Sequence, residues 1–154
     1  MSTDFLVGGT ASADSYYSDK VAANACDDNE STYWYALTNT PHWWKYDLGI
    51  TTRKVIKLLR IKPGDVSGGY SGLHNFVLKG SNDGVNWNTL LTAYHGNNTN
   101  WEDFAVPNTY AYQYYMLDGL NGYYNFDGHY YYVLLLEIEM LEGITSHSKI
   151  RCIA

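Results

Sequence analysis

The chain has few cysteines, few charged residues and no long apolar run. Its 154 residues include 2 Cys, and Asp, Glu, Lys and Arg together make up 17%. Cys26 and Cys152 are too few for a disulfide framework, and they lack the spacing of a zinc site. We interpret Cys26 as a small buried residue beside a turn, with a disulfide as the alternative. No segment is long and apolar enough to cross a bilayer.

Positive charge is also scarce. The chain has 10 Lys and Arg against 16 Asp and Glu, which gives a formal net charge of −6. Because the basic residues do not cluster, this balance argues against binding to nucleic acid or to an anionic membrane surface. Residues 1–15 show neither a basic start nor a long apolar block, so no signal peptide is visible. A cytoplasmic protein and a module of a larger exported protein remain as alternatives.

Aromatic residues and glycine are abundant instead. The chain contains 16 Tyr, 5 Trp, 4 Phe and 14 Gly, and 45% of its residues are hydrophobic. This composition allows a real core and favours a loop-rich β protein over a helical one. No linker, internal repeat or low-complexity tract interrupts the sequence, so we expect a single domain over residues 1–154.

Alternation of apolar and polar residues predicts strands along most of the chain. In segment 42–49 every second residue is apolar, which predicts one buried face. Segment 75–94 predicts a hairpin, because the Asn-Asp-Gly sequence at 82–84 tolerates the positive φ of a tight turn. Segments 55–63 and 130–141 predict further buried strands. The pattern indicates an antiparallel β-sandwich or barrel with almost no helix.

Four segments, in order, resemble the coagulation-factor type C, or discoidin, superfamily, which includes many galactose-binding-like carbohydrate-binding modules. They are ANACDDNESTYW (23–34), HWWKYDLG (42–49), GSNDGVNW (80–87) and LLEIEMLEG (135–143). The resemblance implies an all-β, antiparallel, jelly-roll-like β-sandwich of about eight strands, with its core at about residues 9–143 and neighbouring termini. We expect the four tryptophans of these segments in the core or at its edge: Trp34, Trp43, Trp44 and Trp87.

The segment NACDDNEST is rich in oxygen-bearing side chains, which Ca²⁺ prefers as ligands. In the resembled family this turn binds a structural Ca²⁺. The positions that match its ligands are the carbonyl of Asn24, the side chains of Asp27, Asn29 and Thr32, and Glu137 from the last strand. The alternative is a hydrogen-bonded Asx-type loop without a metal.

Two long connections, residues 63–75 and 118–131, mix glycine with aromatic residues, Asn and Asp. Sugar sites combine a flat aromatic ring with a few hydrogen-bonding side chains, and these connections offer both. The absence of Lys and Arg from 64–74 and 118–130 favours a neutral ligand. The residues expected to contact it are Tyr35, Asn39, Asp65, Tyr70, Tyr123, Tyr124, Asn125 and Phe126. For each of them, covering the end of the sandwich or capping a turn is the alternative.

Of the residues with which galactose-binding members of the family hold their sugar, only the aromatic of the last long loop is matched, by Tyr123, Tyr124 or Phe126. By position, Tyr35 stands where those members have a His, and Thr38 where they have a Trp. Gly64 replaces an Arg, and Gly69 or Tyr70 replaces an Asn. The fold therefore follows from the resemblance, whereas specificity for galactose does not.

Catalysis is not expected. The five His lie in separate segments, and the chain has no GxSxG, HExxH or phosphate-loop motif. We expect a non-catalytic carbohydrate-binding module that recognises a glycan, with Ca²⁺ as a structural cofactor. The module is expected outside the cell or exposed on a surface. The alternative is an adhesion or structural module of a larger assembly, such as a bacteriophage tail or a cell-surface protein. Insertion into phospholipid is not expected, because the loops lack Lys and Arg.

Overall fold

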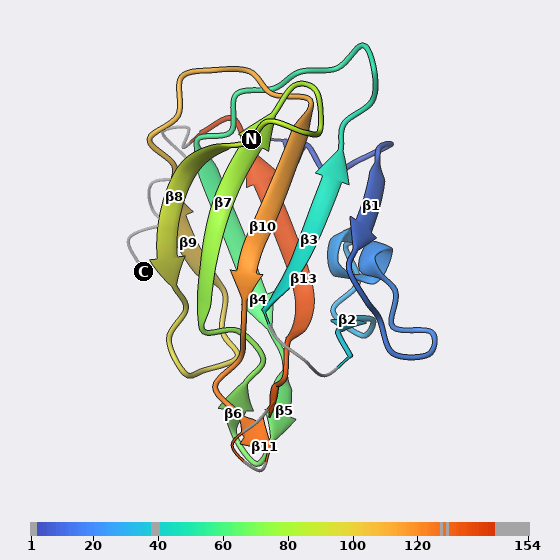
Figure 1. The fold of residues 1–154 in the computed structure, drawn as a ribbon, viewed down its shortest axis with the longest axis vertical. Coiled ribbons are helices and arrows are strands. Elements are labelled where there is room, and N and C mark those ends of the chain that lie inside the picture. Colours follow the sequence, from blue (N-terminus) through green and yellow to red (C-terminus); the bar gives the residue numbers. More distant parts are fainter. Residues whose placement is uncertain (1–2, 38–40, 127, 129, 144–154) are drawn as a thin grey trace.

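A computed structural model describes residues 3–37, 41–126, 128 and 130–143 as a β-sandwich (Figure 1). The strands in the described residues are β1 (Thr10–Ala13), β2 (Trp34–Tyr35), β3 (His42–Asp47), β4 (Leu58–Pro63), β5 (Asp65–Ser67), β6 (Tyr70–Ser71), β7 (Asn75–Ser81), β8 (Asn88–Tyr94), β9 (Glu102–Ala105), β10 (Tyr114–Leu120), β11 (Asn125–Phe126), β12 (Tyr130–Tyr131) and β13 (Leu134–Leu141). One short 3-10 helix, η1, spans Ala22–Cys26. No helix in these residues is long and apolar enough to cross a membrane.

Two antiparallel sheets form the sandwich. One has the order β1-β3-β10-β7-β8, and the other has the order β2-β13-β4-β9. This arrangement confirms the predicted fold class. The expectation of about eight strands was wrong, because the described residues form thirteen. The additional strands are mostly short: the two long connections that we expected as loops fold back on themselves as the hairpins β5–β6 and β11–β12.

The predicted periodicities appear in the sheets. From His42 to Asp47, buried and partly exposed side chains alternate along β3. β7 and β8 form the predicted hairpin, with Gly84 at a φ of 73° in its turn. Hydrogen bonds from Asn86 and from the backbone of Val85 hold the pKa of Asp83 well below its usual range in this turn.

The core lies between the sheets and holds two of the four tryptophans. Trp34 and Trp44 are fully buried. Their indole nitrogens donate to the carbonyls of Ser15 and Ala22, both at 2.9 Å, so neither ring leaves its polar atom unsatisfied. Trp43 and Trp87 are partly exposed and are not among the residues that pack against the core, so the prediction holds for Trp34 and Trp44 only.

The N-terminal segment is attached to the last strand. Asp4 pairs with Leu141, and its Oδ1 accepts hydrogen bonds from the backbone nitrogens of Leu6 (3.1 Å) and Met140 (2.9 Å). Burial raises the pKa of Asp4 to about 6, well above the usual range of an aspartate. The two backbone hydrogen bonds hold the Asp4 carboxylate in place, but burial removes part of the hydration that stabilises its charged form.

Replacing Asp4 by Asn is expected to stabilise the protein by ~1 kcal/mol near neutral pH. The native state keeps the Asp4 proton to a higher pH than the unfolded chain, so the parent loses stability as the pH rises from about 4 to about 6. Asn is neutral and keeps the Oδ1 acceptor. Urea unfolding of parent and variant across this range measures the difference. A variant that is less stable than the parent near neutral pH would contradict the expectation.

Candidate functional site

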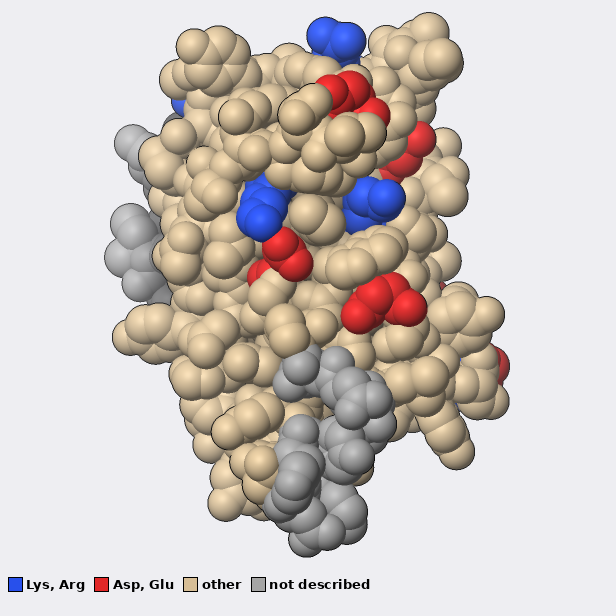
Figure 2. Space-filling model, in the orientation of Figure 1, with Lys and Arg blue, Asp and Glu red and all other residues tan. Residues whose placement is uncertain are grey.

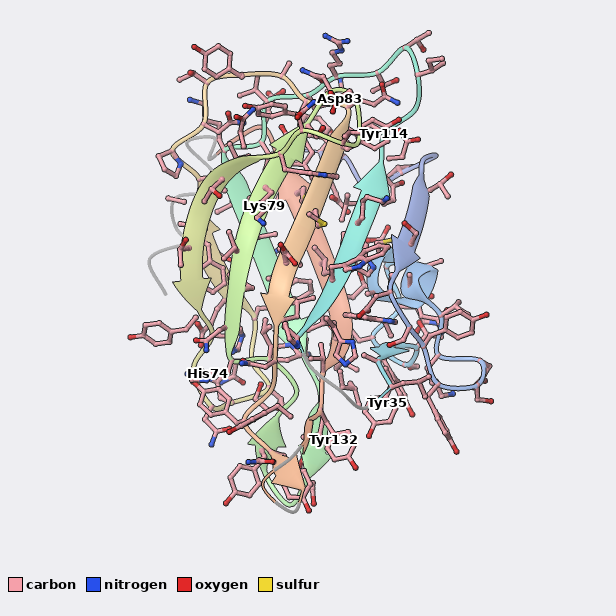
Figure 3. All side chains as sticks on the ribbon, viewed as in Figure 1. Tyr35, His74, Lys79, Asp83, Tyr114 and Tyr132 are labelled. Carbon is pink, nitrogen blue, oxygen red and sulfur yellow. The ribbon has the colours of Figure 1, made fainter. Side chains whose placement is uncertain are left out.

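The lower end of the sandwich in Figure 1 carries the hairpins β5–β6 and β11–β12 together with β2. Five tyrosine rings from separate segments form a chain of contacts there, which we call the tyrosine ladder. Its members, in order, are Tyr17, Tyr35, Tyr132, Tyr124 and Tyr70. Figure 3 shows Tyr35 and Tyr132 near one another at this end.

The ring geometry within the ladder is regular. The centroids of Tyr35 and Tyr132 lie 5.9 Å apart, and those of Tyr132 and Tyr124 lie 5.7 Å apart, with near-parallel planes in both pairs. Tyr17 meets Tyr35 edge-on at 6.1 Å, and Tyr70 lies tilted beside Tyr124 at 5.8 Å. Each such pair contributes about 0.5–1.5 kcal/mol, so neighbouring rings hold one another in position.

A second aromatic group lies at the same end of the sandwich. The His74 ring is 4.2 Å from that of Tyr123 and 6.3 Å from that of Tyr94. The Tyr123 hydroxyl donates to the carbonyl of His95 at 2.6 Å. Burial raises the pKa of Tyr35 and of Tyr123, so both hydroxyls remain neutral in the physiological range.

The structure brings together the four predicted tyrosines, namely Tyr35, Tyr70, Tyr123 and Tyr124. The Asp65 carboxylate is also at this end, where both of its oxygens accept from the nitrogen of Gly69 and close the β5–β6 turn. Asn125 lies in β11. Phe126 ends that strand, but its side chain lies outside what the structure describes, and Asn39 lies outside the described residues altogether.

Four residues at this end were missed in the sequence: Tyr17, His74, Tyr94 and Tyr132. Tyr17 is 57% exposed in the polar segment DSYYSDK, and an aromatic pair in such a segment was an available signal. Tyr132 lies inside the predicted strand 130–141, which the structure divides into β12 and β13, and Tyr94 ends a predicted hairpin. These residues are recognised as part of the site only through their ring contacts with other residues at this end of the sandwich.

The lower end has little charge. On the face shown in Figure 2, charged side chains lie over the strands and at the right edge, and the described part of the lower tip shows none. Gly64 stands where the resemblance predicts an Arg in galactose-binding members; it packs against Leu134, and a Cβ there would collide with the Leu134 side chain. This position therefore carries no cationic side chain.

The acidic turn after η1 meets the last strand at the predicted positions. The nitrogen of Asn29 donates to Glu137 Oε1 at 3.0 Å and to Asp27 Oδ1 at 3.1 Å. The Thr32 hydroxyl donates to Asp27 Oδ2 at 2.6 Å. Burial, together with the adjacent Asp27 carboxylate, raises the pKa of Glu137 to about 8.

The oxygen-rich turn brings two acidic side chains together. Two carboxylates, Asp27 and Glu137, face one another from residues far apart in the sequence, and Glu137 is only 2% exposed. The raised pKa keeps Glu137 protonated near neutral pH, where its carboxyl hydrogen-bonds to Asp27, and two ionised carboxylates at this buried position would be unfavourable without a cation between them. Among the described residues, no group of three or more His, Cys, Asp or Glu side chains converges, so amide, hydroxyl or carbonyl oxygens would complete a Ca²⁺ shell.

The one close His–Asp pair that we find in the described residues is buried. His42 Nδ1 lies 2.8 Å from Asp14 Oδ2, and the His42 side chain is 2% exposed. Its Nε2 is buried without a hydrogen-bond partner. Because the ring is enclosed by protein, this pair is not placed to contact a substrate as a general base.

Comparison with known proteins agrees with this architecture. A family model described as a NedA-like, galactose-binding domain of the F5/8 type C group matches residues 24–116. No curated protein sequence matches the chain.

Several solved structures share the fold. CpGH89CBM32-5 from Clostridium perfringens, in complex with GalNAc-β-1,3-galactose, has a TM-score of 0.75 and 18% identity, over 90% of this chain and 99% of that one. The family 32 module of C. perfringens NanJ, in complex with galactose, has a TM-score of 0.74 and 18% identity, over 91% and 98% of the two chains. A pectin-binding module is 23% identical with a TM-score of 0.71, over 94% and 95%.

Some relatives are parts of enzyme chains. Truncated AlyQ contains a CBM32 and alginate lyase domains, and the match covers 91% of this chain but 32% of that one. The structural relatives of this chain are thus carbohydrate-binding modules, which occur both as isolated modules and beside catalytic domains.

Proposed function

Because the chain belongs to the F5/8 type C family of NedA-like, galactose-binding domains, we propose that it is a non-catalytic carbohydrate-binding module. It recognises a glycan with the lower end of the sandwich. The observation that carries this proposal is the tyrosine ladder, which four separate parts of the chain build at one end of the sandwich. Two of its rings, those of Tyr17 and Tyr70, are exposed, and the other three are partly exposed. Aromatic rings beside neutral hydrogen-bonding groups match the apolar faces and hydroxyl rims of sugars.

The ligand is an uncharged glycan rather than a uronate or a sulfated sugar. The ladder consists of neutral tyrosines, and the position of the family's Arg is Gly64, packed against Leu134. Solved relatives are named for galactose, GalNAc-galactose, pectin and mannuronic acid ligands, so the fold accommodates several sugars. The affinity is weak, ~0.1–1 mM or about −4 to −5.5 kcal/mol, because a shallow site buries little surface and must displace bound water.

A structural Ca²⁺ at the acidic turn is part of the proposal. The Asn24 carbonyl, the side chains of Asp27, Asn29 and Thr32, and the Glu137 carboxylate would hold it. The ion would neutralise the two facing carboxylates and would join the turn to β13. It would fix the scaffold that ends at β2 and would take no part in chemistry.

A glycan array screened with Ca²⁺ and with a chelator tests the function. We expect hits among neutral glycans, and titration of a hit at low and high salt should give nearly the same affinity, because no ion pair is proposed. Hits confined to sulfated or uronate glycans, with affinity that falls steeply with salt, would contradict the neutral ligand. An array without hits would favour the adhesion or structural module of a larger assembly.

The relatives that sit beside catalytic domains suggest the setting. We propose that this module acts outside the cell or on a surface, as part of a larger parent protein that it directs to its glycan. The membrane has no role in this proposal.

A further inference from the structure

A cavity of about 590 Å³ opens at the upper end of the sandwich, opposite the tyrosine ladder. It lies between the start of β8 and the connection from β9 to β10, which Figure 1 shows at the top of the molecule. Figure 3 shows the separation: Asp83 and Tyr114 mark the upper end, and Tyr35 and Tyr132 the lower end. The volume falls within the range of about 300–1,000 Å³ that is typical of small-ligand sites.

Hydrogen bonds of the buried Asn108 side chain hold the β9–β10 connection, which forms one wall of the cavity. Asn108 is 3% exposed, and its amide donates to the carbonyls of Ile56 (3.4 Å) and Tyr110 (2.9 Å). Its Oδ1 accepts from the nitrogen of Tyr110 at 3.0 Å. The Asn108 amide is thus anchored to Ile56 by one hydrogen bond and holds the Tyr110 backbone by two, so this backbone is in position before a ligand binds.

Asn82, from the β7–β8 turn, fixes the other end of the same connection. Its amide donates to the carbonyl of Ala111 at 3.2 Å, and its Oδ1 accepts from the nitrogen of Gln113 at 2.9 Å. The amide of Asn88 donates to the Tyr112 hydroxyl at 3.3 Å across the cavity wall. A wall that is ordered in advance loses little conformational entropy when a ligand binds.

The groups left free on this wall are hydroxyls and one aromatic ring. Within the described part of the chain, the side chains of Thr89, Thr109 and Tyr110 have no protein partner. Tyr110 is 71% exposed and is one of the residues that line the cavity. Pro107 and Leu90 supply apolar surface beside these hydroxyls.

Among the residues that the structure describes, no Asp, Glu, Lys, Arg or His lines the cavity. A phosphate, sulfate or carboxylate ligand would therefore find no compensating charge, whereas a purely apolar ligand would desolvate the hydroxyl and amide groups without replacing their hydrogen bonds. An uncharged sugar matches both features, since its C–H face packs on a ring and its hydroxyls pair with neutral polar groups.

We propose that this cavity is a second sugar-binding site for an uncharged mono- or disaccharide, at the end of the module opposite the ladder. The class of ligand follows from the lining of the cavity and does not depend on what the ladder binds. With two sites at opposite ends, one copy of the chain joins two glycan chains.

NMR titration of the ¹⁵N-labelled chain separates the two ends. The probes are galactose, N-acetylgalactosamine, N-acetylglucosamine, cellobiose and maltose, each added to millimolar concentration, with galacturonic acid as the charged comparison. For at least one neutral probe we expect shifts of the amides of residues 88–90 and 107–112. Galacturonic acid should leave these amides unchanged. Shifts of the amides of the ladder residues test the proposed function instead. The cavity proposal and the proposed function can therefore fail independently.

Tyr110→Ala is the decisive variant, because its ring is exposed and its loss should leave the fold intact. We expect the affinity of the cavity for the sugar to fall about tenfold in this variant. The amide shifts at Tyr124 and Tyr132 should follow the same titration curves as in the parent. Tyr110→Phe keeps the ring and should retain most of the affinity. Absence of shifts at 88–90 and 107–112 with every neutral probe would overturn the proposal. Shifts that persist unaltered in Tyr110→Ala would overturn it equally.

Discussion

Tyr124→Ala is expected to abolish measurable glycan binding at the lower end of the sandwich. Tyr124 lies within the ladder, 5.7 Å from Tyr132 and 5.8 Å from Tyr70 between ring centroids. Its removal eliminates its own stacking surface and two contacts that position its neighbours. A loss of ~1–2 kcal/mol is a large share of a total of about −4 to −5.5 kcal/mol, so the affinity falls below what calorimetry detects.

Two further variants show whether the ring itself is responsible. Tyr124→Phe keeps the ring and removes the hydroxyl, and we expect it to bind within a few-fold of the parent. Tyr16→Ala removes a tyrosine that is 53% exposed next to Tyr17 but belongs to no ring contact among the described residues. It should bind as the parent does. Parent-like affinity in Tyr124→Ala, Tyr35→Ala and Tyr70→Ala together would place the glycan elsewhere.

Calcium is expected to raise the melting temperature of the chain by about 5–10 °C. A ligand that binds only the folded state adds ~2.7 kcal/mol of stability at a hundredfold excess over its dissociation constant. For a domain of this length, that free energy corresponds to several degrees. The effect follows from the contact of Asp27 with the buried Glu137, which a divalent cation would neutralise. Calorimetry with Ca²⁺ and with a chelator measures it.

Glu137→Gln provides a test whose two halves have opposite signs. In chelator the variant should be at least as stable as the parent, because it removes one of two facing carboxylates and Gln can donate to Asp27. In Ca²⁺ it should be the less stable of the two, because a ligand to the ion is lost. Glu139→Gln, two residues along β13, is the matched control: Glu139 pairs with Arg60 at 2.6 Å, so the response to Ca²⁺ should persist. Identical melting curves of the parent with and without Ca²⁺ would rule out the metal.

Much of the fold could be predicted from local sequence. The alternation along β3 and the Asn-Asp-Gly turn between β7 and β8 are local signals, because side-chain direction and turn conformation depend on neighbouring residues. The strand count was wrong for the same reason. The hairpins β5–β6 and β11–β12 consist of two- and three-residue strands, too short for a pattern of alternation to register.

The acidic turn was also predicted in its parts, since the acidic segment and Glu137 carry the resemblance to the family. Their meeting is a tertiary fact. Asn29 and Glu137 are separated by 108 residues, and only the packing of η1 against β13 brings them to hydrogen-bonding distance.

By itself, the sequence determined an antiparallel all-β domain with an acidic turn and two aromatic, glycine-rich connections, because composition and period-two alternation act over a few residues. Only the tertiary structure decided which tyrosines form one surface. Tyr17 and Tyr132 join Tyr35 in the ladder because three separate segments end at the same edge of the sandwich. The cavity beside Tyr110 also depends on the tertiary structure, because it forms only where β8 and the β9–β10 connection lie side by side. Contacts between residues far apart in the chain depend on how the sheets stack, which no local pattern records.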